Sequence, residues 1–255
     1  MTYDRLPFTR DREVIVDAGY LAASRHIIHA LIEVDVTRPR QLLKGTSGSD
    51  GRPHSFTAFI VGSVAQAVQA HPVVHGYRNL RRQLVVFHEI DVVTLIEPTP
   101  GAVAIPHIIR GANRRTVRDI SEEIRSIQAS PGSSAQRSGL VTLALRVPRF
   151  ARLLFIRALK LNPRWMKTVQ GTVIVTSVGM FGNRLGWGIG FLMAHTLGVT
   201  VGGIGERPVV HDGAIAIREC LDMTLSFDHD IVDGAPAARF AQTITEMIES
   251  ASALG

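Results

Sequence analysis

Cysteine is nearly absent from this chain of 255 residues, in which Cys220 is the only one. A single thiol cannot form an internal disulfide. No charged start followed by an apolar signal core precedes the stretch "LPFTRDRE". Nothing in the sequence therefore points to an oxidising compartment, and we expect a cytoplasmic protein.

Long apolar runs are missing as well. Arg, Pro or Gly interrupts each apolar stretch well before the roughly 20 residues that a membrane span requires. The net charge is +6 and the pI is about 10.2, yet zinc-knuckle spacing, recognition-helix patterns and basic runs interleaved with aromatics are absent. The basic excess therefore favours solubility or a small anionic partner, and we expect no nucleic-acid binding.

Apolar residues make up 45% of the chain, which is enough for a substantial core. Helical spacing predicts helices at 9–25, 55–72, 116–129 and 235–250, with Thr9, Ser55 and the Thr116–Asp119 pair as N-terminal caps. Strand patterns cover 29–37, 84–98, 101–109, 171–182 and 197–228, and Asp212-Gly213 is the turn of a hairpin. No repeat or linker divides the chain, so residues 1–255 are predicted to form one α/β domain, a mixed sheet flanked by helices.

The segment 131–168 is atypical because Arg and Lys alternate there with Leu, Phe and Ile. This pattern indicates an amphipathic helix, or a helix pair bent at Pro148. One interpretation is contact with a membrane surface. We favour the other, in which the apolar stripe packs on the core while Arg146, Arg149, Arg152 and Arg157 face solvent or phosphate, and we expect no membrane contact.

The stretch "SFDHDIVDGAPAARF", residues 226–240, places His229 and Asp233 in a short connection between a long strand and the last helix. Functional side chains are often held in such loops, and histidine is suited to act as a general base. Alternatively, His229 merely ends the strand and Asp233 caps the helix. The spacing of the two residues leaves both interpretations open.

Other motifs carry less weight. His26 with His29, or His71 with His75, lack the accompanying carboxylates or cysteines of a metal site, so we expect no metal. The glycine-rich pieces "GWGIGF" and "TVGGIGERP" do not have phosphate-loop spacing. Their glycines are expected to allow close backbone packing beside a site.

The C-terminal stretch resembles the His-x-x-x-Asp-Gly signature of the catalytic domain of dihydrolipoamide acyltransferases, the acyltransferase components of 2-oxo acid dehydrogenase complexes. Similarity extends to "LPFTRDR", "LIEVDVT", "PHIIRGANRRTVRDISEEI" and "GTVIVTSVGMFG". It covers nearly the whole chain except about 131–168. The resemblance implies a fold like that of chloramphenicol acetyltransferase, a coenzyme A-dependent acyltransferase.

The resemblance also assigns roles. His229 matches the general base that deprotonates the thiol of coenzyme A or dihydrolipoamide, and Thr176 matches the hydroxyl that donates to the oxyanion. Asp233 matches a carboxylate that braces the site, for which Arg12, or failing that Arg10, is the candidate partner. Gly234 would let the turn pass close to the helix start.

An assembly follows from the same resemblance: a homotrimer with active sites between subunits, His229 of one chain facing Thr176 of its neighbour. The lipoyl group is expected on another protein, and dehydrogenase components are candidate partners. Asp230 departs from the family, where Arg is common, and puts the acceptor in question. The C-terminus "ESASALG" lacks a bulky apolar end, so we expect assembly to stop at the trimer.

The leading hypothesis is acyl transfer between coenzyme A and a thiol such as dihydrolipoamide, without a covalent enzyme intermediate. A second hypothesis keeps His229 and Thr176 but transfers the acyl group to a hydroxyl or amine of a small molecule. A third is a non-catalytic trimeric scaffold, against which the retained His229, Thr176 and Asp233 argue.

Overall fold

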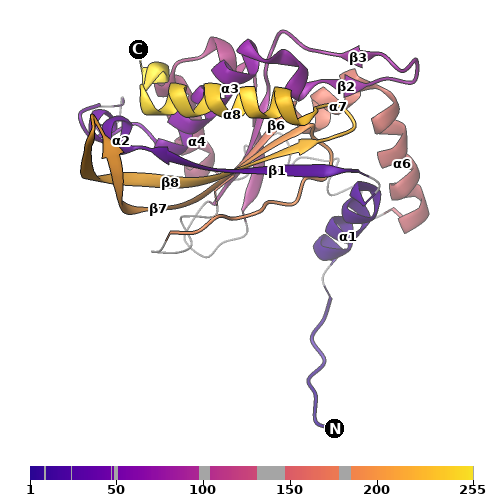
Figure 1. The fold of residues 1–255 in the computed structure, drawn as a ribbon. Helices are drawn as coiled ribbons and strands as arrows, with labels where there is room; N and C mark the ends of the chain where they lie inside the picture. Colours follow the sequence, from indigo (N-terminus) through magenta and orange to yellow (C-terminus); the bar gives the residue numbers. More distant parts are fainter. Residues whose placement is uncertain are drawn as a thin grey trace.

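A computed structural model describes residues 1–8, 10–23, 25–46, 48, 51–97, 104–130, 147–177 and 185–254. Its centre is a six-stranded sheet with the order β1-β8-β7-β6-β4-β5 (Figure 1). The strands are β1 Ile27–Asp35, β4 Val92–Ile96, β5 Ile105–Ile109, β6 Val173–Ser177, β7 Leu197–His211 and β8 Ala214–Asp228. β6 runs parallel to β4 and β7, and the other neighbours are antiparallel, so the predicted mixed sheet is confirmed.

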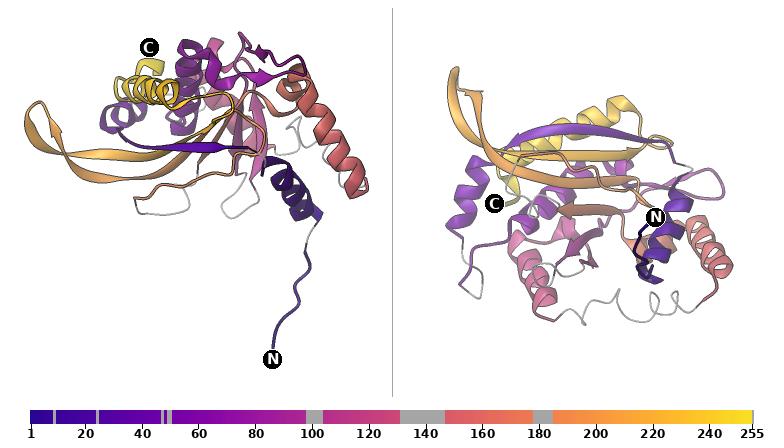
Figure 2. Two further views of the ribbon diagram at one scale, coloured as in Figure 1. Left: turned by 45° about the vertical axis from the view of Figure 1, so that its right-hand side comes forward. Right: turned by 90° about the horizontal axis from the view of Figure 1, so that it is seen from below.

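Helices cover one face of this sheet. The helices are α1 Arg10–Ala22, α2 Thr37–Lys44, α3 Phe56–Ala70, α4 Val117–Ala129, α6 Arg149–Leu161, α7 Pro163–Gln170 and α8 Gly234–Glu249. Short 3-10 turns occur at η1 Pro72–His75, η2 Ala112–Arg114 and η5 Ser252–Leu254. α3, α4 and α8 share the main core with the sheet, whereas α1 and α6 pack together beyond its end (Figures 1 and 2). In the described part of the chain, no helix is long and apolar enough to cross a membrane.

The sequence of β8 explains why the two faces of the sheet differ. Successive strand residues point to opposite faces, and "LDMTLSFD" alternates strictly between apolar and polar residues. Its apolar members, Leu221, Met223, Leu225 and Phe227, belong to the core under the helices. Its polar members, Asp222, Thr224, Ser226 and Asp228, are also buried, but on the opposite face. β8 therefore has one apolar side and one polar side.

Local sequence signals predicted several boundaries correctly. The Ser55 side chain accepts a hydrogen bond from the Ala58 N–H at the start of α3, and Thr116 and Asp119 form the full capping box of α4. Asp212 and Gly213 both have positive φ at the turn between β7 and β8, as a tight hairpin requires. Thr9, the predicted first cap, lies outside the described residues.

Other boundaries were predicted wrongly. The strand expected at 84–98 is split, because β3 Leu84–Val85 pairs with β2 Tyr77–Arg78 in a separate small sheet. α2 was missed, since the sequence there resembles a strand end followed by a loop. Pro148 is the N-cap residue of α6, and because residues 131–146 lie outside the described part of the chain, the bend expected there stays a prediction. A break that was not predicted lies between α6 and α7, where Asn162 caps α7 and Pro163 occupies its first turn.

One arginine of α6 that was predicted to face solvent is buried instead. Arg152 is only 8% exposed and forms an ion pair with the buried Asp17 of α1, with 2.7 Å between Nη2 and Oδ2. Arg149 binds the same carboxylate through Nε at 2.7 Å. Burial alone would raise the pKa of Asp17, but these two guanidinium groups hold it below its usual value. Arg152 therefore anchors α6 instead of facing solvent. Arg149 binds Asp17 but is 61% exposed, Arg157 is exposed as expected, and Arg146 lies outside the described residues.

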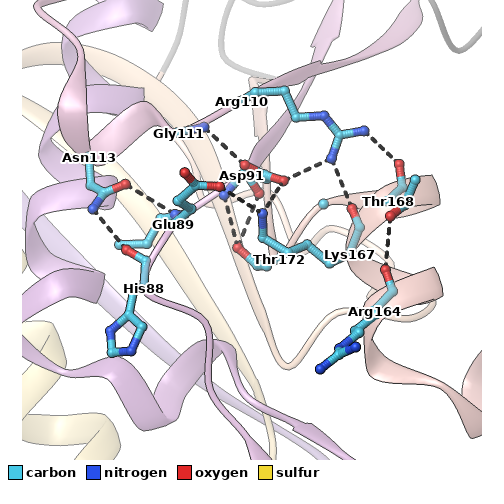
Figure 3. Close-up of polar contacts among 12 residues, drawn as sticks. His88, Glu89, Asp91, Arg110, Gly111, Asn113, Arg164, Lys167, Thr168 and Thr172 are labelled. Atoms are coloured by element: carbon cyan, nitrogen blue, oxygen red, sulfur yellow. Dashed lines mark hydrogen bonds and ion pairs between the residues drawn. The ribbon is translucent and has the colours of Figure 1, made fainter.

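A second buried carboxylate attaches α7 to the sheet. Asp91 is 1% exposed and forms ion pairs with Lys167 (2.9 Å) and Arg110 (2.8 Å), while the Gly111 N–H donates to its other oxygen (Figure 3). Arg110 also donates to the carbonyl oxygens of Lys167 and Thr168 near the end of α7. One carboxylate thus joins β4, the turn after β5 and the helix that leads into β6.

Replacing Asp91 by Asn should destabilise the protein by about 2 to 4 kcal/mol, because it leaves two cations without their buried counter-charge. Burial raises the pKa of Asp91, but the bonds from Lys167, Gly111 and Arg110 outweigh burial and lower it. A lowered pKa stabilises the fold above the unfolded pKa, so this contribution is lost as the pH falls below about 4. Urea unfolding followed by circular dichroism at neutral and acidic pH measures both effects.

Arg114→Gln is the matched control, since the Arg114–Glu89 pair belongs to the same cluster but is exposed. It should change the free energy of unfolding by less than about 1 kcal/mol. Equal losses in the two variants, or a loss in Asp91→Asn that does not shrink in acid, would contradict this account.

Candidate active site

The loop after β8 is held rigidly. The carbonyl oxygen of Asp228 accepts hydrogen bonds from the N–H groups of Ile231 and Val232, both at 3.0 Å. The His229 N–H donates to the His26 carbonyl oxygen at 2.7 Å and so extends the pairing between β1 and β8. Val232 is fully buried in the main core. His229 is therefore presented on a short connection anchored at both ends.

His229 and Asp233 point toward each other. The distance between His229 Nδ1 and Asp233 Oδ1 is 3.9 Å, and the two side chains are 44% and 83% exposed. Asp233 is the N-cap residue of α8 by position, but its side chain makes no capping hydrogen bond. The capping role considered from the sequence is therefore not observed. Neither side chain has a hydrogen-bond partner among the described residues.

An ion pair that the sequence did not reveal fixes the base of this loop. Arg25 contacts Asp228, with 3.1 Å between Nη1 and Oδ2, and both side chains are largely buried. Arg25 also donates to the carbonyl oxygens of His195 and Ala194 at 2.7 and 2.8 Å. Arg25 lies two residues before β1, and Ile27 of β1 pairs with Asp228 of β8. Knowledge of that strand pairing would therefore have identified the ion pair.

Arg12, the predicted partner of Asp233, forms no ion pair with it among the described residues of one chain. Arg12 is exposed on α1, and Asp233 contacts His229 instead. Nothing is described for the side chain of Arg10. A Cβ atom at Gly234 would meet no described atom within 4 Å, so the close approach expected at this glycine is not seen within one chain.

Asp230, the residue that departs from the family pattern, has a partner. His26 Nδ1 lies 2.8 Å from Asp230 Oδ1 at the protein surface. The hydrogen bond to Asp230, followed by the attraction of its charge, raises the pKa of His26. When His26 is protonated, the charge that Asp230 places beside His229 is therefore largely compensated.

Thr176 lies on the face of the sheet that carries the polar residues of β8. Its neighbour Val175 pairs with Val199 in the helix-covered core, so Thr176 points to the other side, level with Thr200 of β7 and Thr224 of β8. Its hydroxyl is half-buried and has no hydrogen-bond partner among the described residues. Residues 178–182 of the motif "TSVGMFG" lie outside the described part of the chain.

The segment 185–194 runs closely over this polar face. A Cβ atom at Gly190 would come 2.6 Å from the Thr200 hydroxyl and 3.3 Å from Thr176 Cγ2. One at Gly202 would come 2.4 Å from the Gly186 carbonyl oxygen. Both contacts are too short for any residue but glycine. The predicted packing role of these glycine-rich pieces is confirmed.

His229 and Thr176 are far apart within one chain. Thr176 is level with Thr224, two strands away, and His229 follows Thr224 by five residues. With about 3.3 Å per strand residue and about 4.8 Å between strands, the separation is roughly 17 Å along the sheet and 10 Å across it. The two side chains of one chain cannot reach the same small reacting group.

Neighbouring histidines do not extend the site. His195 is buried and Nε2 contacts the Gln170 carbonyl oxygen at 2.6 Å, and burial lowers its pKa to about 4. Burial lowers the pKa of His75 to about 4 as well. Within the described ranges, no group of three or more His, Cys, Asp or Glu side chains is arranged to hold a metal ion.

Comparison with known proteins connects this geometry to a family. Residues 133–255 match the family described as 2-oxoacid dehydrogenases acyltransferase (catalytic domain). The acetyltransferase component of the pyruvate dehydrogenase complex of Corynebacterium glutamicum is 28% identical over 93% of this chain and 32% of that protein. The succinyltransferase component of the 2-oxoglutarate dehydrogenase complex of Haemophilus influenzae is 25% identical over 98% of this chain and 55% of that protein.

Solved structures agree on the fold. A probable dihydrolipoamide acetyltransferase from Listeria monocytogenes has a TM-score of 0.73 and 22% identity, covering 98% of this chain and 95% of that one. Chloramphenicol acetyltransferase has a TM-score of 0.53 and 13% identity, with 95% and 96% covered, which confirms the expected fold. The chain spans only about a third to just over half of the length of the two curated relatives. In its C-terminal half by sequence, and over nearly its whole length by fold, the chain is similar to the catalytic domains of 2-oxoacid dehydrogenase acyltransferases.

Proposed function

We propose that this protein transfers an acyl group between coenzyme A and a thiol acceptor such as dihydrolipoamide, with His229 as general base. The observation that carries this proposal is the state of His229 and Asp233. Both side chains are exposed on an anchored loop, 3.9 Å apart, and serve no structural purpose among the described residues. Catalytic groups are often kept available in this way.

The chemistry requires a base and an oxyanion donor. His229 takes the proton of the attacking thiol, and the thiolate sulfur forms a bond to the carbonyl carbon of the thioester. The Thr176 hydroxyl donates to the resulting oxyanion. As the tetrahedral intermediate collapses, the original carbon–sulfur bond breaks and the departing thiolate takes the proton from His229. Asp233, near Nδ1, orients the imidazole so that Nε2 faces the thiol.

The spacing of named residues in a relative supports these roles. A structural study of the dihydrolipoamide acetyltransferase of Azotobacter vinelandii concerns a serine, a histidine and an asparagine in its catalytic mechanism. There the asparagine follows the histidine by four positions, as Asp233 follows His229. The serine precedes the histidine by 52 positions there, and Thr176 precedes His229 by 53 here. Ser177 has the same spacing of 52, but its side chain points to the helix-covered face.

The separation of His229 and Thr176 within one chain supports a site formed by two chains. We therefore propose a homotrimer in which His229 of each subunit faces Thr176 of the next. The acyl-carrying lipoyl group would come from another protein. A relative of known structure is the cubic core of a pyruvate dehydrogenase complex, with a TM-score of 0.75 at 15% identity.

His229→Ala should lower the rate of transfer from acetyl coenzyme A to dihydrolipoamide by about 100- to 10,000-fold, the usual contribution of a general base. Release of coenzyme A, measured by chromatography, reports the rate. His211→Ala is the matched control, because His211 is 48% exposed but lies at the far end of the β7–β8 hairpin. The proposal fails if wild type and His229→Ala release coenzyme A equally.

Mixing two inactive variants tests whether the site is shared. Thr176→Val removes only the hydroxyl and should cost about 100- to 1,000-fold, whereas Thr176→Ser should retain activity. In trimers assembled from equal amounts of His229→Ala and Thr176→Val chains, about a quarter of the interfaces contain both functional groups. Co-expressed mixtures, without selection for mixed trimers, should therefore recover about a quarter of wild-type activity.

If each site were built within one chain, no mixture of these variants would recover activity. That outcome would refute the shared site. It would not affect the role of His229 as the base, which the rate of the His229→Ala variant tests separately.

A further inference from the structure

One face of α6 carries a stripe of apolar side chains that are exposed to solvent. Phe150, Leu154 and Leu161 are 75%, 68% and 50% exposed. Together with the exposed Arg157 they follow the spacing i, i+4, i+7, i+11 and so share one helix face. Large exposed apolar side chains gathered on one helix face usually mark a binding surface.

This orientation is imposed by the rest of the structure. Arg152 and Arg149 bind the buried carboxylate of Asp17, and Leu159 is buried on the same side of α6. Turning the apolar stripe inward would pull Arg152 out of a buried ion pair, which is strongly unfavourable. The outward stripe is therefore a stable feature of α6.

The surroundings of the stripe are basic. Residues 131–170 contain eight Arg or Lys residues and no Asp or Glu, whereas the remaining chain has 20 basic and 22 acidic residues. The excess positive charge of the whole protein therefore resides in this segment. Trp165 is 56% exposed on α7, directly after α6, and Arg164 beside it is exposed as well.

We propose that α6 and the start of α7 bind the surface of an anionic phospholipid bilayer, with α6 lying in the plane of the interface. Phe150, Leu154, Leu161 and Trp165 would enter the headgroup region, and Arg157 and Arg164 would contact phosphate groups. Helices that combine Leu, Phe and Trp with Arg, and lack acidic residues, bind such surfaces.

Charge decides between this partner and a second copy of the chain meeting face to face. A two-fold contact of α6 with α6 would place Arg157 and Arg164 of both copies in one interface without any acidic residue of the segment to neutralise them. An anionic bilayer supplies that counter-charge. The proposal does not depend on the acyl transfer proposed above, because none of its residues belongs to that site.

Flotation of the full chain with lipid vesicles tests the proposal. The protein should float with vesicles of equal parts phosphatidylglycerol and phosphatidylcholine, and not with phosphatidylcholine alone. Arg157→Gln and Arg164→Gln should each weaken binding by about five-fold and reduce its sensitivity to salt. Combined Phe150→Ser, Leu154→Ser and Leu161→Ser should lower it at least about tenfold, without lowering the thermal stability because these side chains are exposed.

The matched control carries Val210→Ser, Ile215→Ser and Ile217→Ser, three equally exposed apolar residues on the β7–β8 hairpin. This variant should bind vesicles as the wild type does. The proposal is overturned if the wild-type protein does not float, or if the α6 triple variant floats like the control. It is also overturned if the triple variant sediments as a smaller oligomer, because the stripe would then contact another copy of the chain.

Discussion

The ion pair between Arg25 and Asp228 determines where the chain can place its candidate base. Asp228 ends a strand inside the protein, where a carboxylate without a counter-charge would be strongly unfavourable. Arg25 supplies that charge and also binds the two carbonyl oxygens that precede β7. Loss of either partner would leave a buried charge unpaired, at a cost of about 3 to 5 kcal/mol. The loop that carries His229 starts from this fixed point.

Buried aspartates that pair with basic side chains recur elsewhere in the structure. Asp17 forms an ion pair with Arg152 of α6, and Asp91 forms one with Lys167 of α7. The fully buried Asp222 binds Arg207, whose guanidinium group lies over the Trp187 ring. Each ion pair restricts the orientation in which two elements pack together, because a guanidinium group and a carboxylate bind only in a narrow range of geometries. The apolar core between α3, α4, α8 and the sheet provides most of the buried surface. The aspartates determine how the remaining pieces attach.

Patterns confined to neighbouring residues were read correctly from the sequence. The capping box at Thr116, the cap at Ser55 and the turn at Asp212-Gly213 depend on a few adjacent positions. Errors arose where the partner is distant. Whether Arg152 faces solvent is decided by Asp17, 135 residues away, and a hydrophobic pattern treats each arginine as a surface residue.

The candidate site likewise contains residues that a local motif identifies and a residue whose role depends on a distant partner. His229, Asp233 and Thr176 were identified by motif, and their catalytic roles stay a proposal. Arg25 was missed because its role depends on the pairing of β1 with β8, which are separated by almost the whole chain. Arg12 was chosen from the resemblance instead, and among the described residues of one chain it forms no ion pair with Asp233.

That pairing also has a consequence for the order in which the protein can be made. β1 pairs with β8, α1 is anchored by α6, and α2 packs against α8 and β8. β1 and α2 therefore find these partners only when β8 and α8 have been synthesised, and α1 only when α6 has been. Until then the apolar strand "IIHALIEVD" has no neighbour, and its exposed edge is open to pairing with other nascent chains. Synthesis that slows near the C-terminus would prolong this vulnerable interval.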